Sequence, residues 1–510
     1  MKKRNILRAV ALSVLAAVTA LPLSACKAKT EDKIVLRVCS WEEYIDLGGW
    51  DDDELIEIEN PFEPELGGVI GKNSIPDDFT DWFNSRDYGF KVKVEYSTFG
   101  TNEDLYNRLN LGDVYDLVCP SDYMIMQLIR EGRAEEFSDS FRDASIDDNY
   151  YAKYVSSFIE DAFEQFGGNA YSAGYMWGTT GLVYNHDEVT AEDVSTWAIL
   201  KNPDYARKVT IKDNVRDSYF PALSILNHDT LLSGDGNPDE LLNATDDATI
   251  AAALEILKEI KENVYSFETD SGKADMITGK VLANYQWSGD AVFIMDEADD
   301  DENNEAELWY AVPDESTNLW FDGWVMLKDG INGDERKKIA SEAFVNYLSR
   351  PDNAIRNMYY IGYTSAIAGK MVYDYLDWNY GADDDAEETV QYDVCNFFGD
   401  DYEPLIVDGS SLEIEENGDI NRGRQLFAQY PPKNITDRSV IMVDFGDRLA
   451  AINQMWINVR CLDVKDFDPA VVWSIVGIVV AGGVALTLYK LRYKIFYRTP
   501  KTEITETTDK

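Results

Sequence analysis

Segments with the patterns of strands and helices alternate along this chain, and that alternation restricts its fold more than any other feature. Lys91–Tyr96 alternates apolar and polar residues as a strand does, and Asn102–Leu109 has the pattern of a short helix. Tyr115–Cys119 then has the character of a buried strand, and Tyr123–Arg130 begins another helix. Strands that are joined through a helix run parallel, with right-handed crossovers. This order predicts an α/β fold built on a parallel sheet.

The same order returns further along the chain. Ala173–Tyr184 and Leu282–Gln286 are predicted strands, and Asp246–Val264 is a predicted helix whose apolar residues form one stripe that covers a sheet. Glu335–Leu348 is a second amphipathic helix. About 440 residues lie between the apolar segments near the two ends of the chain, which is enough for two domains with cores of their own. Gly48–Gly89 and Asp374–Asn421 have the composition of insertions on this scaffold, with no role that we can assign.

Residues 1–26 have the features of an export signal. A basic head precedes the apolar stretch Ala9–Leu23, which is too short to span a bilayer comfortably. The stretch ends in Leu23-Ser24-Ala25-Cys26, which resembles a bacterial lipobox with Cys26 as the lipid attachment site. The alternative is an ordinary secretory peptide with an incidental cysteine.

The other end of the chain has the composition of a membrane anchor. Ala470–Tyr489 is free of charged residues and is long enough to cross a bilayer as a helix. Basic residues follow it and acidic residues precede it, so the positive-inside rule places residues 490–510 in the cytoplasm. We therefore expect a protein held at the cell membrane by a lipid and a transmembrane helix, with its binding domain outside.

The charge of the chain excludes one large class of partners. Its net charge is −48, because 46 Lys and Arg stand against 94 Asp and Glu. Such a charge repels nucleic acid phosphates and attracts cations. Part of it lies in acidic stretches such as Asp299–Glu302, which are typical of solvated loops, so charge alone does not identify a ligand.

The sequence lacks the residues and motifs of most common catalytic and metal sites. Its only histidines are His186 and His228, which leaves out most His-dependent triads and His-based metal sites. We find no Walker A motif and no dinucleotide fingerprint, so no cofactor and no metal are expected. The cysteines beyond Cys26 lack CxxC spacing, and three disulfide pairings remain open among Cys39, Cys119, Cys395 and Cys461.

Aromatic and acidic residues gather where the first strand should end. The strand-like run Ile34–Val38 is followed closely by Trp41-Glu42-Glu43-Tyr44. In open α/β sheets, ligands bind beyond the carboxyl ends of the strands. Aromatic faces and carboxylates together suit an organic cation. This segment therefore indicates a receptor for a positively charged ligand.

Further motifs of the same kind follow in order along the chain. They are Ser40-Trp41-Glu42-Glu43-Tyr44-Ile45, Tyr115-Asp116-Leu117-Val118-Cys119-Pro120-Ser121-Asp122-Tyr123, Tyr175-Met176-Trp177-Gly178-Thr179-Thr180-Gly181, Trp287-Ser288-Gly289, Trp320-Phe321-Asp322, and Arg350-Pro351-Asp352 with Ile361-Gly362-Tyr363. Together they resemble the spermidine/putrescine-binding group of the extracellular substrate-binding proteins of ABC transporters. The resemblance runs from about residue 34 to 365, and more weakly to 463. A C-terminal membrane helix is not part of the usual family pattern.

The resemblance implies a two-lobed, type II periplasmic-binding-protein-like α/β fold with a hinge between the lobes. Lobe 1 would comprise residues 34–178 and 323–379, and lobe 2 residues 179–322 and 380–463. The function implied is that of a receptor without enzymatic activity, which delivers putrescine or spermidine to an ABC permease with its ATPase subunit. The residues that the resemblance assigns to substrate binding are Trp41, Glu42, Glu43, Tyr44, Ser121, Tyr123, Asp217, Trp287, Trp320, Asp322 and Tyr363.

The chemistry of a polyamine gives these residues distinct expected roles. Its ammonium groups need carboxylates, which Asp217 and Asp322 would supply, and its methylenes need flat apolar walls. The walls would be Trp41, Trp287 and Tyr363, and the far end would be held by Glu43, Ser121 and Tyr123.

Three departures from the family pattern leave the preferred amine open. Glu42 replaces a residue that is often threonine. Many relatives have two acids around an Arg, and here one of them is either shifted or replaced by Asn214. A late glutamine of some relatives would fall near Ile441–Met442, where the chain has no clear counterpart. The choice between putrescine and spermidine is therefore not predicted.

Other interpretations compete with this one. A single Trp or Tyr is more often a core residue than a ligand contact, and Asp122 has the position of a helix N-cap. Thiamine, a sugar or another amine remain alternative ligands. A carboxylate-based hydrolase is the alternative from another class, but adjacent acids such as Glu42 and Glu43 point in opposite directions in an extended segment.

Overall fold

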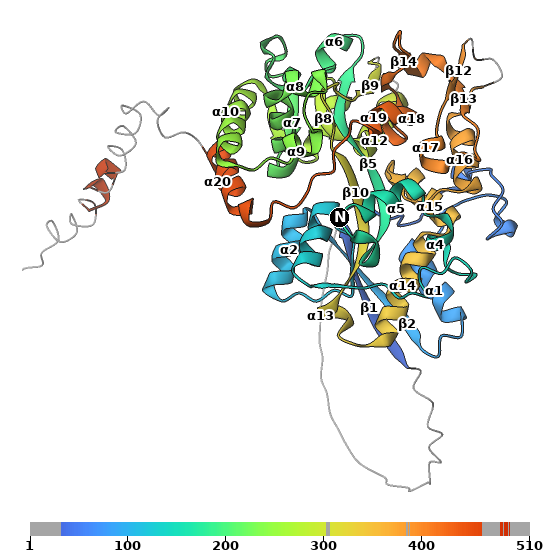
Figure 1. Ribbon diagram of the computed structural model, residues 1–510. Coiled ribbons are helices and arrows are strands. Elements are labelled where there is room, and N and C mark those ends of the chain that lie inside the picture. Colours follow the sequence, from blue (N-terminus) through green and yellow to red (C-terminus); the bar gives the residue numbers. More distant parts are fainter. Residues whose placement is uncertain are drawn as a thin grey trace, which may run out of the picture.

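A computed structural model describes residues 32–301, 306–383, 386, 388–461, 480–482, 484–487 and 489. Its first sheet region is parallel, as predicted. Strand β1 (Lys33–Trp41) pairs in parallel with β2 (Lys91–Phe99) on one side and with β3 (Leu117–Val118) on the other. These strands alternate with helices that cover them (Figure 1). The helices nearest to them are α1 (Ile75–Ser85), α2 (Asn102–Leu111), α3 (Asp122–Arg130), α14 (Glu335–Leu348) and α15 (Pro351–Ile361).

Two long antiparallel strands connect this lobe to a second one. Strand β5 (Ser172–Asn185) and β10 (Leu319–Leu327) pair with each other from Leu319 with Thr179 to Val325 with Ser172. The end of β10 also pairs with β3, whereas the second half of β5 pairs with strands of the other lobe. Figure 1 shows β5 and β10 running between the two groups of helices. The molecule is therefore two-lobed, and strands cross between the lobes.

The second lobe is built around the far half of β5. Its central strands lie side by side in mixed directions, because β6 pairs in parallel with β7 and β8, while β8 and β9 are antiparallel to β5. Their bounds are β6 (Val209–Lys212), β7 (Ser266–Glu268), β8 (Ala283–Trp287) and β9 (Leu308–Ala311). The helices of this lobe include α7 (Val215–Leu226), α8 (His228–Ser233), α9 (Pro238–Leu242), α10 (Asp247–Asn263), α11 (Ser271–Ile277), α12 (Ser288–Asp300) and α20 (Leu449–Arg460).

Two clusters of buried apolar side chains form the core. The larger one runs from β1, β2 and β10 into α12 and β9 of the second lobe, and the other includes Leu182, Tyr285 and Leu257 from β5, β8 and α10. The stripe predicted on the helix over residues 246–264 accounts for this packing, because Leu257 and Ile260 of α10 are fully buried.

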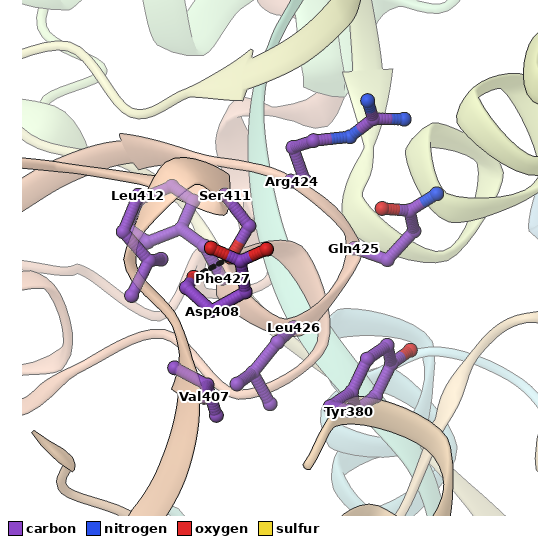
Figure 2. A pocket seen from close by; sticks show the side chains of 9 residues that line it. All are labelled: Tyr380, Val407, Asp408, Ser411, Leu412, Arg424, Gln425, Leu426 and Phe427. Atoms are coloured by element: carbon purple, nitrogen blue, oxygen red, sulfur yellow. Dashed lines mark hydrogen bonds between the residues drawn. The ribbon is translucent and has the colours of Figure 1, made fainter. Parts of the chain in front are cut away.

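Regular structure occurs in both segments that have the composition of insertions. The first holds α1 and an isolated bridge between Ile56 and Val69. The second holds α16 (Lys370–Tyr380) in part and a small antiparallel sheet of β12 (Thr389–Tyr392) and β13 (Leu405–Asp408). A cavity of about 140 Å³ lies between these elements and α18 (Gln425–Gln429), as Figure 2 shows. It contains none of the predicted site residues.

The structure does not support the expected membrane helix over Ala470–Tyr489, so that prediction is wrong. A helix needs about 20 consecutive apolar residues to cross a bilayer. Among the residues that the structure describes, no helix combines that length with that apolar character. Within the expected span, residues 480–482, 484–487 and 489 are helical and exposed, and its other positions lie outside the described residues.

Three further expectations fall outside the described part of the chain. They are the export signal over residues 1–26, lipid attachment at Cys26, and the tail over residues 490–510. The four described cysteines are free thiols, with Cys39 buried in β1 and Cys119 buried directly after the adjacent strand β3.

Candidate functional site

The predicted site residues lie at one edge of the sheet. Trp41 ends β1, Ser121 follows β3 at the start of α3, and Trp287 ends β8. Asp322 belongs to β10, which runs antiparallel to β3, so the first residues of β10 lie at the edge where β3 ends. A bridge between Ser121 and Asp322 joins the two segments directly. The rule that ligands bind beyond strand ends therefore selects the same edge from both lobes.

Asp322 is the most unusual group at this edge. Its side chain accepts a hydrogen bond of 2.6 Å from the Tyr44 hydroxyl at Oδ2, while Oδ1 is buried without a hydrogen-bond partner. The residue is only 5% exposed. Burial raises the pKa of Asp322 to about 6, and the hydroxyls of Ser121 and Tyr44 oppose that rise. Within the described residues no cation lies within 4.0 Å of this carboxylate. A buried carboxylate oxygen without a partner is energetically costly, so it is suited to accept a ligand donor.

Aromatic rings surround Asp322. Tyr44 packs edge-on against Tyr175 and Tyr363, with ring centroids 5.5 and 5.3 Å apart. Trp320 lies 5.6 Å from Tyr363, and its Nε1 donates to the Thr179 carbonyl at 3.1 Å. Such rings present apolar faces to methylenes and negative faces to cations.

A glycine allows Tyr363 to approach the second lobe. Tyr363 follows Gly362, the C-cap of α15, and its ring lies against Gly289 in the first turn of α12. A Cβ atom at Gly289 would lie only 2.1 Å from the nearest ring carbon. The Tyr363 hydroxyl then donates to Asp290 of the same helix at 2.9 Å. The two lobes are therefore in contact at this ring.

Asp217 has a different environment from Asp322. It lies in the first turn of α7 and is buried, with Asn214 donating to its Oδ2 at 2.5 Å. Asn214 also caps the helix, because its Oδ1 accepts the Asp217 amide at 2.8 Å. Burial raises the pKa of Asp217, and Asn214 and Lys212 counter part of that rise. Asn214 thus supports the Asp217 carboxylate from two sides.

Ser121 and Tyr123 are joined through Asn102. The Asn102 amide donates to the Ser121 hydroxyl at 3.1 Å and to the Tyr123 hydroxyl at 2.9 Å. The ring of Tyr123 is covered by the guanidinium of Arg216, 3.9 Å from its centroid. Arg216 belongs to α7, so this contact also joins the two lobes.

Only part of the motif Trp41-Glu42-Glu43-Tyr44 lies among the buried residues around Asp322. Trp41 packs on Phe99 with centroids 4.9 Å apart, and its Nε1 is buried without a partner. Glu42 and Glu43 are exposed in the turn after β1, where Glu43 has a left-handed φ of 52°. The structure therefore brings Tyr44 to Asp322 but leaves both glutamates at the surface.

Three charged residues of this region escaped the sequence analysis. Asp290 follows the Trp287-Ser288-Gly289 motif directly, and it lies 3.8 Å from Lys212 and 3.3 Å from Lys273. Lys212 ends the apolar strand β6 and is 1% exposed at its side chain. The rule applied to acids at strand ends would have found Asp290. A lysine that closes an otherwise apolar strand would have been the signal for Lys212.

Asp122 has a second role besides its position at the start of α3. One oxygen accepts the amide of Tyr123 at 2.6 Å, and the other accepts the amide of Phe321 at 3.2 Å. Burial raises the pKa of Asp122 to about 7. Because Phe321 lies between Trp320 and Asp322, this carboxylate fixes β10 at the site.

Comparison with known proteins identifies relatives of this chain. The family described as bacterial extracellular solute-binding protein matches residues 78–370. The spermidine/putrescine-binding periplasmic protein of Salmonella typhimurium is 29% identical over 274 residues, which cover 53% of this chain and 70% of that protein. The putrescine-binding periplasmic protein PotF of Escherichia coli is 26% identical over 275 residues, covering 51% and 67%.

Solved structures show the same fold. The spermidine/putrescine ABC transporter substrate-binding protein PotD of Streptococcus pneumoniae aligns with a TM-score of 0.51 at 21% identity, over 83% of this chain and 99% of that one. The Tp0655 (TpPotD) lipoprotein of Treponema pallidum aligns with a TM-score of 0.55 at 18% identity, over 84% of this chain and 99% of that one. The resemblance predicted from the motifs is confirmed, and the chain belongs to the family of bacterial extracellular solute-binding proteins.

Proposed function

We propose that this chain is the substrate-binding receptor of a polyamine ABC importer and captures protonated putrescine or spermidine between its lobes. The observation that carries the proposal is the buried Oδ1 of Asp322, which has no partner and lies among aromatic rings. An ammonium group satisfies that oxygen, and the rings suit its methylenes. The relatives described above as spermidine/putrescine-binding and putrescine-binding proteins support the same class of ligand.

Different residues bind the ammonium groups and the methylenes of the ligand. Asp322, with Tyr44 and Ser121 beside it, takes one ammonium group, and Asp217 takes the next. Trp287, Trp320 and Tyr363 form walls for the methylenes, while Trp41 and Tyr123 lie at the outer parts of the site. Glu42 and Glu43, which are exposed, act at most through their charge on an approaching cation.

The lobes close on the ligand by bending of the strands that join them. We assign residues 34–178 and 323–379 to lobe 1, and residues 179–322 and 380–463 to lobe 2. The exported protein, with a lipid on Cys26, presents the ligand to an ABC permease, and a separate ATPase subunit supplies the energy.

A calorimetric titration of the purified full chain tests the ligand. We expect saturable binding of putrescine, spermidine or both at physiological salt, with a dissociation constant of about 1 μM or below. A neutral sugar and thiamine serve as control ligands. Folded, ligand-free protein that gives no heat with either amine would overturn the proposal.

The proposal also predicts how affinity depends on pH. Ammonium groups of the ligand stay protonated below neutral pH, whereas Asp322 has a pKa of about 6 and must be ionised to bind them. Affinity should therefore be highest near neutral pH and fall as the pH drops through about 6. Dissociation constants measured across this range provide the test, and an affinity that stays constant through it would contradict the role of Asp322.

A further inference from the structure

A lysine of the chain itself already occupies one aromatic wall of the proposed site. The Nζ of Lys212 lies 4.0 Å from the centroid of the Trp287 ring, which is the position that a ligand ammonium takes on an aromatic face. The side chain of Lys212 is 1% exposed, so this is a buried contact rather than a surface one.

The surrounding groups hold Lys212 in that position. Its ammonium donates to the Thr269 carbonyl at 3.0 Å and lies 3.9 Å from Glu268 and 3.8 Å from Asp290. Glu268 is fixed in turn by the Gly272 amide at 2.9 Å. The positive charge of Lys212 is thus balanced by two carboxylates, and its ammonium has a hydrogen-bond acceptor, as a buried ammonium requires.

Lys212 also changes which carboxylates remain for a ligand. It acts on Asp217 and lowers the pKa of that carboxyl against the larger effect of burial. Asp290 is shared between Lys212, Lys273 and the Tyr363 hydroxyl. Asp322, by contrast, has no cation within 4.0 Å among the described residues. Asp322 is therefore the carboxylate of the site that the protein's own cations compensate least, and this compensation increases toward Trp287.

We infer that Lys212 is a specificity-determining residue that replaces one ammonium group of a longer amine, so that the site selects a short diamine over a triamine. The inference rests on the proposed function and names the ligand class within it. A diamine such as putrescine places one ammonium at Asp322 and the other toward Asp217. The third ammonium of spermidine would have to extend toward Trp287, where Lys212 occupies the ring face and repels a second cation.

Titration of the full chain with putrescine and spermidine, and with two variants of Lys212, tests this. Lys212→Met removes the charge and keeps an unbranched apolar chain, whereas Lys212→Ala also vacates the space against Trp287. We expect the wild type to bind putrescine about tenfold or more tightly than spermidine, and both variants to reduce or reverse that ratio by about tenfold.

Lys273→Met is the matched control. Lys273 pairs with the same Asp290 at 3.3 Å, but the aromatic ring that it faces is Phe293, 5.5 Å away, and not Trp287. This variant also removes one positive charge beside Asp290. We expect it to leave the ratio of the two affinities within about twofold of wild type.

The outcomes separate this inference from the function on which it rests. Wild-type protein that binds spermidine as tightly as putrescine overturns the inference and leaves the polyamine receptor standing. The same holds if folded Lys212 variants keep the wild-type ratio. Wild-type protein that binds neither amine overturns both. The wild-type ratio is decisive even if a Lys212 variant fails to fold.

Discussion

Asp322→Asn should lower the affinity for putrescine and spermidine by about a hundredfold or more while making the ligand-free protein more stable. The substitution keeps the shape of the side chain and the hydrogen bond from Tyr44, but removes the charge that faces the ligand. A charge-assisted hydrogen bond contributes about 1.5–3 kcal/mol, and an ammonium group left buried without a partner costs more. Calorimetry with both amines measures the loss.

The gain in stability follows from the pKa of Asp322. Its ordinary value is 3.8, and in the folded protein it is raised to about 6. Between these values the folded state binds more protons than the unfolded state, so the free energy of unfolding falls as pH rises through this interval. At neutral pH the ionised carboxylate destabilises the fold by up to about 3 kcal/mol. Asparagine removes this penalty.

Denaturant unfolding of ligand-free protein at neutral pH and near pH 4 tests this second effect, because the two proteins should differ at neutral pH and converge in acid. Asp187→Asn, at an exposed acid in the turn after β5, is the matched control and should change neither affinity nor stability. Near-normal amine affinity in folded Asp322→Asn would show that the site has been placed wrongly.

Gly289→Ala should lower amine affinity by about ten- to a hundredfold without weakening the fold of the second lobe. The added Cβ would lie 2.1 Å from the Tyr363 ring, which must then leave its position between Tyr44, Trp320 and Asp290. Overpacking of this kind costs about 1–3 kcal/mol. Alanine is itself favoured over glycine in a helix such as α12, so the ligand-free lobe has no reason to unfold.

A second substitution distinguishes a blocked contact from a general defect. In Tyr363→Ala the ring that meets the new Cβ is absent, so adding Gly289→Ala to that background should change affinity little. The double-mutant cycle on amine affinity measures the coupling. Additive losses would mean that Gly289 acts through something other than Tyr363.

The sequence predicted the fold well because strand and helix periodicities are local. The predicted helix over 335–348 has the observed bounds, and the strand over 91–96 is found as Lys91–Phe99. The strand that carries Trp320-Phe321-Asp322, Leu319–Leu327, was not among the predicted strands.

The charged lining of the site could not be predicted in the same way. Lys212 and Trp287 are 75 positions apart in the chain, and only the parallel pairing of β6 with β8 brings them together. Glu42 and Glu43 have the composition of ligand contacts, but the turn after β1 directs them to the surface. Which side of a turn a charged residue occupies depends on tertiary packing, which a short motif does not encode.

The irregularity in the strands that join the lobes has a kinetic consequence. The register between β5 and β10 shifts between Asp322 and Gly323, so the carboxylate proposed to hold the ligand is adjacent to the point where the connecting strand departs from regular pairing. Bending at that point turns Asp322 with the strand. We therefore expect the residence time of a bound amine to follow the rate of lobe opening, and substitutions that stiffen Gly323 to slow both capture and release.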